Sequence, residues 1–548
     1  MQFFRYFHTL KNLKPVQIFG RFVFAYRRKF LKIIRAKRVA KIASELKEHI
    51  ELNGQTELEL TFLNKPYTFR LSEMQWKDAD FKVENEKLWL YNLNYFDWIN
   101  SEEPSEQYTT NLVLYMLLDW ISQNADERAE TWEPYPLSKR LSAWVKWLQR
   151  NKPNIETGSV IKLSISQQLK RLFVDMEYHN QANHLLENLR GFLSAGAFLA
   201  EEKQYFTNEL EYQLEQVVDD LIDQLQIQFL SDGAHYERSP MYHADMLEAV
   251  KDIKANAALL YKQKFLVKEL LHKAKLLTKL CESILPKLTN WLKLMTMPDG
   301  MVAQFNDCAR VKGISHNQEE YAELLGASGY FISHDSDKSF IMSCGEPSPA
   351  YQPGHTHCDI MSYELAIKGN RCIIDTGCGS YQNSTLRLMS RQTEAHNLPM
   401  TQHQEQSDIW GSFRIGKRAR ITERTYNAEM KQLTIAITDQ FGQKLKRTTA
   451  FSPNSIKIND KLLKRRMTGN FISLIHLAPE VEPELTSKDG QNIVNCKLTN
   501  GQNFSIISTA AVRIDDYISF PEFGKSVGAK VLILSNKEAE TLDYDINW

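Results

Sequence analysis

Histidine and carboxylate side chains gather in residues 354–359, which read Gly-His-Thr-His-Cys-Asp. If this stretch is extended, its period of two places His355, His357 and Asp359 on one face. Neutral imidazoles and a carboxylate suit Zn²⁺, which at catalytic sites takes three protein ligands and keeps one position for water. The alternative is a set of hydrogen-bonded polar side chains at a domain interface. The pattern predicts a metal site or an acid–base site.

Polar and aromatic residues form a second group earlier in the chain. Residues 183–184 are Asn-His within a helix-like run, and residues 232–243 form a turn that leads into the next helix. Loops of this composition line sites on rigid scaffolds more often than they fill cores, although an aromatic residue and a histidine at a helix start are commonly structural. Aromatic residues also crowd 91–98 and 132–140, where exposed rings would stack on sugars and buried rings would pack in a core.

Two hydrophobic patterns divide the chain. From about residue 105 to 330 apolar residues recur at helical spacing, as at Leu185, Leu189 and Leu193, which predicts antiparallel helix pairs in a solenoid or closed toroid. After about residue 338 short β-rich runs separated by Asn, Gly and Asp predict an antiparallel β domain. Helices followed by strands imply two packed domains rather than a βα alternation.

Charge and turn residues predict the boundaries. The polar stretch 333–337 directly follows apolar residues, so we place a domain border there. Gly369-Asn370 predicts a hairpin turn. The expected domains are a basic N-terminal arm at 1–50, an α/α toroid at 51–333 and an antiparallel β-sandwich at 334–548. The expected strands include 338–344, 362–367, 432–437, 455–458 and 504–508.

In their order these motifs resemble heparinase II/III-type lyases and the related alginate lyases. Residues 355–359, Asp-Thr-Gly at 375–377 and Arg-Gln-Thr-Glu-Ala-His-Asn at 391–397 look like the metal-site signature of that family. Residues 183–184, 232–243, 298–300 and 306–307 look like its helical-domain motifs. The resemblance spans about residues 85–400. It implies an α+β multidomain fold, an incomplete α/α toroid followed by an antiparallel β-sandwich, with the site between the two.

The resemblance also implies roles for individual residues. A zinc ion that shapes the site would be held by His357, Asp375 and His396. The catalytic residues would be Asn183, His184, Tyr242 and His355. We further predict substrate contacts for Tyr236, Glu237, Arg238, Arg391 and Asn397, and no organic cofactor.

The implied reaction is β-elimination on a polysaccharide that contains uronic acid. It removes the proton α to a uronate carboxylate and expels the O4-linked sugar, so an enolate-like transition state must be stabilised. Asn183 and His184 would donate hydrogen bonds to the carboxylate, and a donor aimed at developing charge is worth about 3 kcal/mol. Tyr242 would protonate the leaving oxygen, and either His355 or Tyr242 itself would be the base.

The metal site sets a requirement on the backbone. A regular hairpin at Gly369-Asn370 places Asp375 opposite Glu364, about 20 Å along the strand from His357 at about 3.3 Å per residue. For the two residues to share an ion, the chain near residues 355–359 must curl back or contain a bulge.

Composition limits the partners. Lys+Arg and Asp+Glu both number 67, so no overall field attracts a polyanion, and an anionic polysaccharide needs a local basic cleft. We predict no nucleic-acid partner, and no uncharged apolar run is long enough to span a bilayer. Charged residues interrupt every early hydrophobic stretch, so no secretory signal is predicted, and the seven cysteines lack a CxxC spacing. We therefore expect reduced thiols and a cytoplasmic protein, with the oligomeric state left open.

The N-terminal arm is basic. Residues 1–50 contain 13 Lys and Arg against Glu45 and Glu48. This imbalance predicts a peripheral contact with an anionic partner or a membrane surface, and a solvated helix face is the alternative.

Two other functional classes fit the same sequence. One is a glycoside hydrolase on a similar toroid with Asp232 and Glu237 as its carboxylates, which would release reducing ends without unsaturation. The other is a non-catalytic polysaccharide-binding or assembly protein of a capsule or exopolysaccharide pathway.

Overall fold

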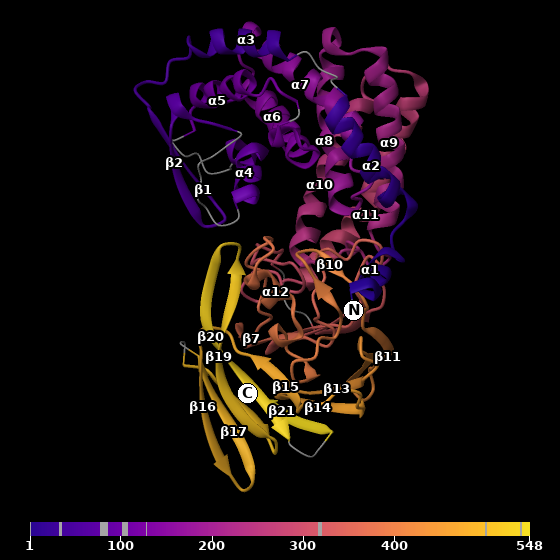
Figure 1. The fold of residues 1–548 in the computed structure, drawn as a ribbon, viewed down its shortest axis with the longest axis vertical. Helices are drawn as coiled ribbons and strands as arrows, with labels where there is room; N and C mark the ends of the chain where they lie inside the picture. The colour runs from indigo at the N-terminus through magenta and orange to yellow at the C-terminus, as the bar shows by residue number, and fades with distance from the viewer. Residues whose placement is uncertain are drawn as a thin grey trace. The chain divides into compact units, whose positions relative to one another are not determined.

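The computed structural model describes residues 2–31, 36–76, 86–100, 108–127, 129–315, 320–498, 501–536 and 540–548. Residues 32–35 of the predicted basic arm lie outside this part. The chain forms two compact units (Figure 1). The first, here called the β unit, comprises Met1–Leu13, Phe229–Asp245 and Lys287–Trp548, and the second, the helical unit, comprises Lys14–Gln228 and Met246–Pro286.

The helical unit is built from amphipathic helices with a small hairpin. Its helices are α2 (Pro15–Phe30), α3 (Lys37–Lys47), α4 (Glu86–Tyr95), α5 (Thr110–Gln123), α6 (Pro134–Asn151), α7 (Ile155–Asp175), α8 (Ala182–Glu201) and α9 (Asn208–Gln228). Both α10 (Pro240–Tyr261) and α11 (Lys268–Leu294) contribute residues to both units. The hairpin pairs β1 (Glu57–Phe62) with β2 (Lys65–Arg70). Short 3-10 turns cover Leu71–Glu73, Asp97–Asn100, Glu130–Trp132 and Lys203–Tyr205.

Capping and close packing explain these helices. The Thr109 hydroxyl accepts a hydrogen bond from the Leu112 amide at the start of α5, and the Asn154 side chain caps α7 in the same way. Helix α8 passes very close to α6, because a Cβ on Gly191 would lie 2.5 Å from the Ser138 carbonyl oxygen. The predicted apolar stripe of α8 is buried, which confirms its helical periodicity.

The described part of the β unit contains three large antiparallel sheets. The five-stranded sheet follows chain order through β3 (Tyr321–Leu325), β4 (Tyr330–His334), β5 (Lys338–Ser343), β6 (Tyr363–Ile367) and β7 (Asn370–Ile373). The eight-stranded sheet has the order β11 (Arg420–Asn427), β12 (Gln432–Thr438), β13 (Lys444–Ser452), β14 (Ser455–Lys464), β21 (Thr541–Asn547), β18 (Asn503–Ser508), β17 (Gln491–Leu498), β16 (Val481–Lys488). The four-stranded sheet has the order β19 (Ala511–Glu522), β20 (Lys525–Asn536), β15 (Phe471–His476), β8 (Pro399–Thr401).

Smaller elements complete this unit. They are α1 (Gln2–Leu10), α12 (Thr385–Arg391), a 3-10 turn at Thr393–Ala395, and the strand pair β9 (Ile409–Trp410) and β10 (Arg414–Ile415). The α1 helix is fastened to that pair, since Arg5 forms an ion pair with Asp408 at 2.6 Å and Tyr6 packs edge-on against Trp410. The first residues of the predicted arm therefore belong to the β unit.

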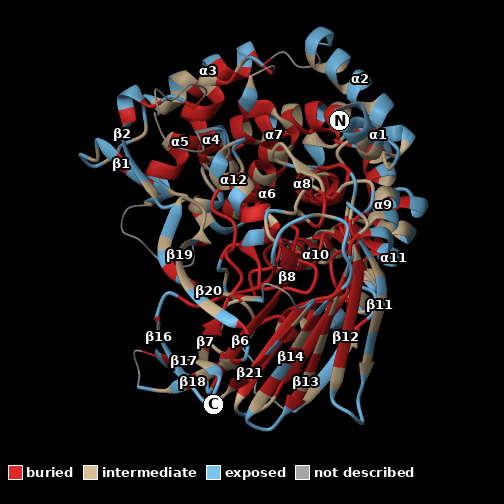
Figure 2. Cartoon of the chain, turned by 60° about the horizontal axis from the view of Figure 1, so that its bottom comes forward, coloured by how far each residue is buried: buried red, intermediate tan, exposed pale blue. Residues whose placement is uncertain are grey.

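Burial patterns show where the core of the β unit lies. Strands β13 and β14 alternate between buried and more exposed residues, so one face of the eight-stranded sheet supports a core (Figure 2). By contrast β4, β5 and β6 are buried along their whole length. One face of these strands contributes Phe340 and Leu365 to a large core with the other sheets, and the other face contributes Ile341 and Ala366 to a second core. The segments that carry the candidate site connect to these buried strands.

The five strands predicted from the sequence are all present, and only their ends shift. The hairpin between β6 and β7 is also confirmed, but its turn is Lys368-Gly369, one residue earlier than expected, with φ angles of 47° and 86°. In the polar stretch 333–337, Ser333 and His334 end β4, and residues 335–337 connect it to its partner β5. The predicted domain border at 333/334 thus falls inside a hairpin. The predicted helical region also ends early, because β3 and β4 both begin before residue 334.

No helix in the described part of the chain is both long enough and apolar enough to cross a membrane.

Candidate active site

The turn that carries Tyr242 is anchored at the start of α10. Ser239 precedes the helix, and its hydroxyl accepts a hydrogen bond from the Tyr242 amide and donates one of 2.6 Å to the Asp307 carbonyl. Within the same turn Gly233 has a φ of 94°, and a Cβ there would lie 2.4 Å from the Lys287 carbonyl oxygen. Only glycine fits this approach, so the sequence fixes the path of the chain into Tyr242.

His355 and Tyr242 lie against each other. Their ring centroids are 4.1 Å apart and the rings are tilted by 35°. The Tyr242 hydroxyl is 2.8 Å from the Tyr381 hydroxyl, and the Tyr381 ring lies 6.0 Å from the His355 ring. Two predicted catalytic residues, over a hundred positions apart in the sequence, are therefore neighbours, and Tyr381 is a third member that the sequence analysis missed.

Asp307 fixes the tautomer of His355. The Nδ1 atom of His355 is 2.8 Å from Oδ2 of Asp307. Burial alone would raise the pKa of Asp307, but the Arg387 guanidinium and hydrogen bonds from His355 and His357 hold it well below its usual range. An ionised carboxylate only accepts hydrogen bonds, so Nδ1 of His355 must carry the proton. In the neutral ring the lone pair is then on Nε2, which lies 3.7 Å from a Glu237 carboxylate oxygen.

The Asp307 carboxylate also binds His357 and Arg387. Nε2 of His357 lies 2.9 Å from Oδ1 of Asp307, and Arg387 donates from both terminal nitrogens, one at 2.8 Å to Oδ2. All three side chains are fully buried. The buried guanidinium supplies the opposite charge that a buried carboxylate requires. Asp307 belongs to the 306–307 motif of the sequence, yet no pattern there indicated its partner in α12.

The segment 354–359 is not a strand. It consists of turns, and the left-handed φ of 79° at Met361 helps to reverse the chain before β6. This stretch therefore does not take the extended form that would place His355, His357 and Asp359 on one face, although His355 and His357 both contact Asp307. The chain therefore curls back, as a shared metal site requires. As a result Ser362 donates a hydrogen bond of 3.0 Å to Asp375, and the centroids of the His357 and His396 rings lie 5.4 Å apart.

The three predicted metal ligands are fully buried in this region. Nδ1 of His396 lies 2.8 Å from Oδ2 of Asp375. Burial would raise the pKa of Asp375, but His396 and then His357 lower it. Burial also lowers the pKa of the His357 imidazole to about 4, which keeps that ring neutral. Nδ1 of His357 and Nε2 of His396 are buried and have no hydrogen-bond partner among the described residues.

This donor set fits a zinc ion. Buried polar atoms are normally satisfied, and two imidazole nitrogens on neighbouring rings without a hydrogen-bond partner are donors of the kind that a zinc ion binds. A zinc-bound imidazole commonly donates its other nitrogen to a carboxylate. Asp375 is in position to accept such a hydrogen bond from Nδ1 of His396, and Asp307 is in position to accept one from Nε2 of His357. Direct ligation by Asp375 stays a prediction.

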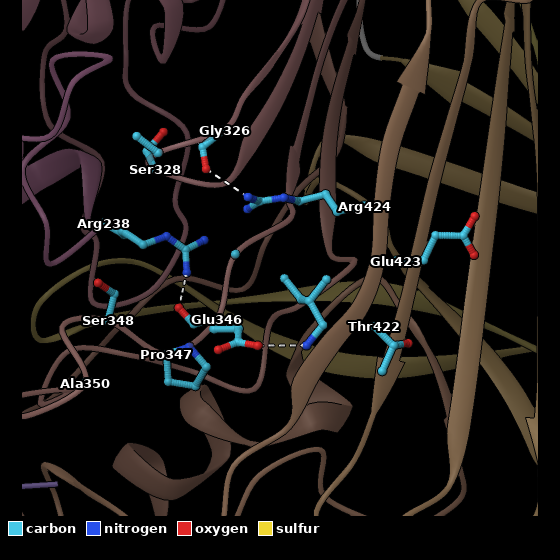
Figure 3. A pocket seen from close by; sticks show the side chains of 13 residues that line it. Arg238, Gly326, Ser328, Glu346, Pro347, Ser348, Ala350, Thr422, Glu423 and Arg424 are labelled. Atoms are coloured by element: carbon cyan, nitrogen blue, oxygen red, sulfur yellow. Dashed lines mark hydrogen bonds between the residues drawn. The ribbon is translucent and has the colours of Figure 1, made fainter.

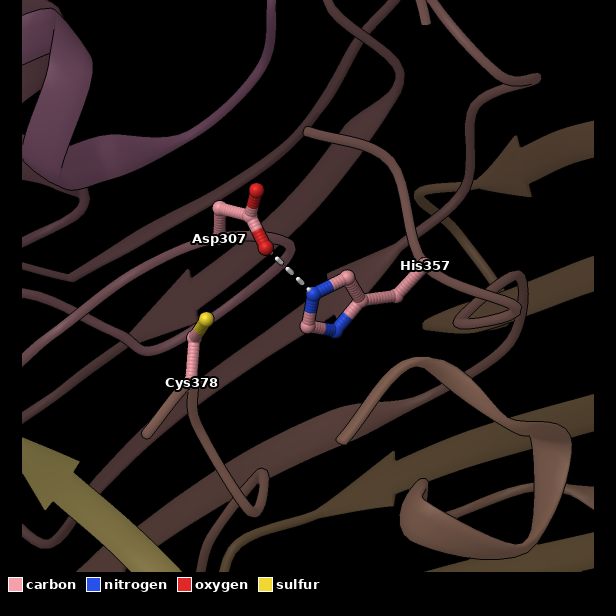
Figure 4. A group of neighbouring side chains, drawn as sticks. All are labelled: Asp307, His357 and Cys378. Carbon is pink, nitrogen blue, oxygen red and sulfur yellow. Dashed lines mark hydrogen bonds and ion pairs between the residues drawn. The ribbon is translucent and has the colours of Figure 1, made fainter. Parts of the chain in front are cut away.

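A second group of ligand types shares His357. A carboxylate oxygen of Asp307, a ring nitrogen of His357 and the thiol sulfur of Cys378 all lie within 4.8 Å of one another (Figure 4). The Arg387 guanidinium, however, donates both to Asp307 and to the sulfur at 3.2 Å. Burial also raises the pKa of the Cys378 thiol, which disfavours the thiolate that binds metals. These contacts favour the His357 and His396 nitrogens over this group.

Asn183 and His184 lie in the first turn of α8, within the helical unit. His184 is partly exposed, and its Nδ1 is 3.1 Å from Oε2 of Glu177. The centroid of its ring lies 4.5 Å from that of the Tyr135 ring, and the two rings are tilted by 43°. Asn183 is buried. Two residues with left-handed φ angles, Gln181 and Ala182, precede them. The convergence of Asn183 and His184 with Tyr242 and His355 stays a prediction.

The predicted substrate-binding residues have mixed surroundings. A Glu237 carboxylate oxygen lies 3.7 Å from Nε2 of His355. Arg391 is fully buried and donates to the carbonyls of Thr356, Gly411 and Ser412. Asn397 is also fully buried. Its amide bonds the backbone of Tyr363, Ile374 and His476. These bonds hold the backbone around the site, and substrate contacts by Arg391 and Asn397 stay predictions.

Tyr236 and Arg238, also predicted to touch substrate, are both buried in the turn before α10. The Arg238 side chain faces a cavity of about 600 Å³ in the β unit and donates to the Glu346 carbonyl at 2.6 Å (Figure 3). Arg424 on another wall donates to the Gly326 carbonyl. Because both guanidinium groups donate hydrogen bonds to backbone carbonyls, these two arginines stabilise the loops around the cavity.

Two family descriptions match the chain. Heparinase II/III N-terminus matches residues 6–329, and heparinase II/III-like, C-terminal, matches residues 317–547. No curated protein matched.

Solved structures share the fold. A heparinase III structure is 16% identical, with a TM-score of 0.65, over 95% of this chain and 85% of its own. The heparinase III-BT4657 gene product is 15% identical with a TM-score of 0.62, over 98% and 90%. A mutant of heparan sulfate lyase HepC from Pedobacter heparinus is 15% identical with a TM-score of 0.58, over 97% and 88%. These likenesses confirm the predicted fold class, an incomplete α/α toroid followed by an antiparallel β-sandwich. Because the N-terminal description alone covers more than half of the chain, the protein belongs to the heparinase II/III family and is a polysaccharide lyase.

Proposed function

We propose that this lyase cleaves a uronic-acid-containing polysaccharide by β-elimination, with His355 as base and Tyr242 as acid. The observation that carries the assignment is the contact between the two rings, with Asp307 holding the proton on Nδ1 of His355. This leaves Nε2 with a lone pair, as a general base requires. His355 takes the α-proton of the uronate. The electron pair of the broken carbon–hydrogen bond forms a carbon–carbon double bond as the bond to the leaving O4 breaks. Tyr242 protonates that oxygen.

The remaining predicted residues support this step. Asn183 and His184 would donate to the uronate carboxylate, which stabilises the enolate-like transition state. Tyr381 supports the Tyr242 hydroxyl through their 2.8 Å contact. Zinc would be held by His357 and His396 with Asp375 beside them, and its charge would fix the two loops that flank His355. Heparinase III and heparan sulfate lyase are among the solved structures with this fold, so heparan sulfate is our first candidate substrate. Alginate and bacterial capsular polyuronates are the next candidates.

The test is a panel of these polymers, followed by the near-ultraviolet absorbance of the unsaturated product. We expect absorbance with at least one polymer. Tyr242→Phe should lower kcat about a hundredfold or more, in the usual range for a general acid. Tyr212→Phe, an exposed tyrosine on α9, is the matched control and should leave kcat unchanged. Substrate binding without turnover in the unaltered protein would favour the non-catalytic alternative instead.

Contacts of Asp232 argue against the hydrolase alternative. Its two carboxylate oxygens accept hydrogen bonds from the Ala234 and Ser328 amides. Asp232 therefore stabilises the turn before α10. New reducing ends without unsaturation would reverse this conclusion.

Metal analysis tests the zinc proposal separately. We expect about one zinc per chain in the purified protein and loss of that zinc in His396→Ala. His334→Ala is the control, because His334 is also buried but bonds to Leu294 and Ser339. Equal zinc content in both variants would exclude His396 as a ligand.

A further inference from the structure

Helix α2 is attached to the helical unit by its polar side. The Arg27 guanidinium donates to the Val174 carbonyl at 2.8 Å, and Arg28 forms an ion pair with Asp175 at 3.2 Å. Gly20 allows close contact, because a Cβ there would lie 2.8 Å from the Cβ of His179. The inward face of α2 thus combines Arg27, Arg28 and Gly20 with one ring, Phe24, which lies 4.6 Å from the His179 ring. Most of the large apolar side chains of the helix therefore lie elsewhere than on its attached face, unlike those of a usual surface helix.

The outward face of α2 is aromatic. Phe19, Phe22, Tyr26 and Phe30 are 76%, 74%, 59% and 59% exposed. Their spacing of three and four residues places them along one side of the helix, and Figure 2 shows α2 mostly in the colour of exposed residues. Single exposed apolar residues are ordinary, but a continuous stripe of large rings marks a surface that is covered by something.

The charge of α2 indicates what covers it. The helix contains Arg21, Arg27, Arg28 and Lys29 and no acidic residue, in a chain whose formal net charge is zero. Arg21 and Lys29 are exposed. Aromatic rings on one side with exposed cations beside them are the pattern of a helix that lies in the plane of an anionic membrane surface. With 16 residues and four cations, α2 is too short and too charged to span a bilayer.

We propose that α2 docks the protein on an anionic phospholipid surface. The aromatic stripe enters the headgroup region while Arg21 and Lys29 bind lipid phosphates, and the contacts with α7 keep the helix attached to the protein. This inference is independent of the lyase reaction.

The experiment is co-sedimentation of the full chain with phosphatidylcholine vesicles and with vesicles that also contain phosphatidylglycerol. We expect binding only to the anionic vesicles, and weaker binding at high salt because the charges are screened. Phe19→Ser/Phe22→Ser should weaken binding about tenfold or more. Ile155→Ser/Met430→Ser, which alters two other strongly exposed apolar residues, should bind like the unaltered protein.

A second pair of variants tests the charges. Arg21→Glu/Lys29→Glu should weaken vesicle binding about tenfold or more, whereas Lys457→Glu/Lys461→Glu, with the same change in net charge on exposed residues of β14, should not. Absence of binding to anionic vesicles would overturn the proposal. So would a dimer in solution that Phe19→Ser/Phe22→Ser dissociates, because a second copy of the chain would then be the occupant.

Discussion

At the residue scale, Asp307 links the predicted catalytic residue His355 to the predicted zinc ligand His357. It binds His355, His357 and Arg387 at once. We expect Asp307→Asn to lower kcat about a hundredfold or more, because the amide no longer enforces the tautomer with a free Nε2 on His355. It should also lower the free energy of unfolding by about 3 kcal/mol, since Arg387 stays buried without a counter-charge.

Asp460→Asn separates these two effects. Asp460 pairs with the fully buried Arg447 in the β-sandwich, at 2.7 Å, and so matches the charge environment of Asp307. This control should lose stability to a similar extent while the folded protein keeps its kcat. If both variants lose kcat equally once corrected for the folded fraction, Asp307 has only a structural role. The measurements are thermal unfolding and initial rates of unsaturated product.

Tyr381 gives a finer test of the same site. Its hydroxyl pairs with that of Tyr242, so Tyr381→Phe removes one hydrogen bond and little volume. A hydrogen bond of about 1 kcal/mol predicts a kcat reduced about fivefold to tenfold with KM nearly unchanged. Tyr517→Phe removes a similar buried bond, to the Leu477 carbonyl, and should leave kcat as it was. A change in KM alone would place Tyr381 in substrate binding.

At the element scale, the sequence predicted the strands and turns whose conformation depends on neighbouring residues. Strand alternation and the Gly369 turn were visible because period and turn chemistry depend on neighbouring residues. The path of residues 354–362 could not be predicted from the sequence, because a run of polar residues fits a strand and a series of turns equally well. Its turns are held by bonds to Asp307, which lies 50 residues before His357, and to Asp375 beyond the next hairpin. The pairing of Asp307 with Arg387 was hidden for the same reason.

The β6–β7 hairpin offers a clean test of backbone conformation. Gly369 has a φ of 86°, and a Cβ added there would meet no atom within 4 Å, so Gly369→Ala introduces backbone strain without a clash. We expect the free energy of unfolding to fall by about 1–2 kcal/mol. Gly528→Ala is the control, because Gly528 is equally open and its φ lies outside the left-handed region. Chemical denaturation of both variants measures the difference, and equal stabilities would refute the explanation.

At the scale of the whole molecule, the order of helices and strands predicted the fold class, but it did not reveal how segments interleave. The β unit takes Phe229–Asp245, which is the connection after α9 and the start of α10, and so gains Tyr242. One of its cores joins Ala234, Trp291, Phe305 and Ile332 to residues of β5 and β6. A domain border inferred from a change in hydrophobic pattern marks where strands become frequent. It does not show which residues pack in the same core.

This interleaving predicts the behaviour of the fragment 334–548. The fragment lacks nearly all of β4, so the edge of β5 loses its pairing partner, and it lacks Tyr330 and Ile332, which cover Ile341 and Ala366. Exposed apolar surface and a free strand edge favour aggregation. We expect this fragment to be insoluble or to lack a cooperative unfolding transition, and limited proteolysis of the full chain to yield no stable product that begins near residue 334. A soluble fragment with a sharp transition would show instead that the sheet tolerates a cut at the border the sequence suggested, and that β3 and β4 are dispensable to its stability.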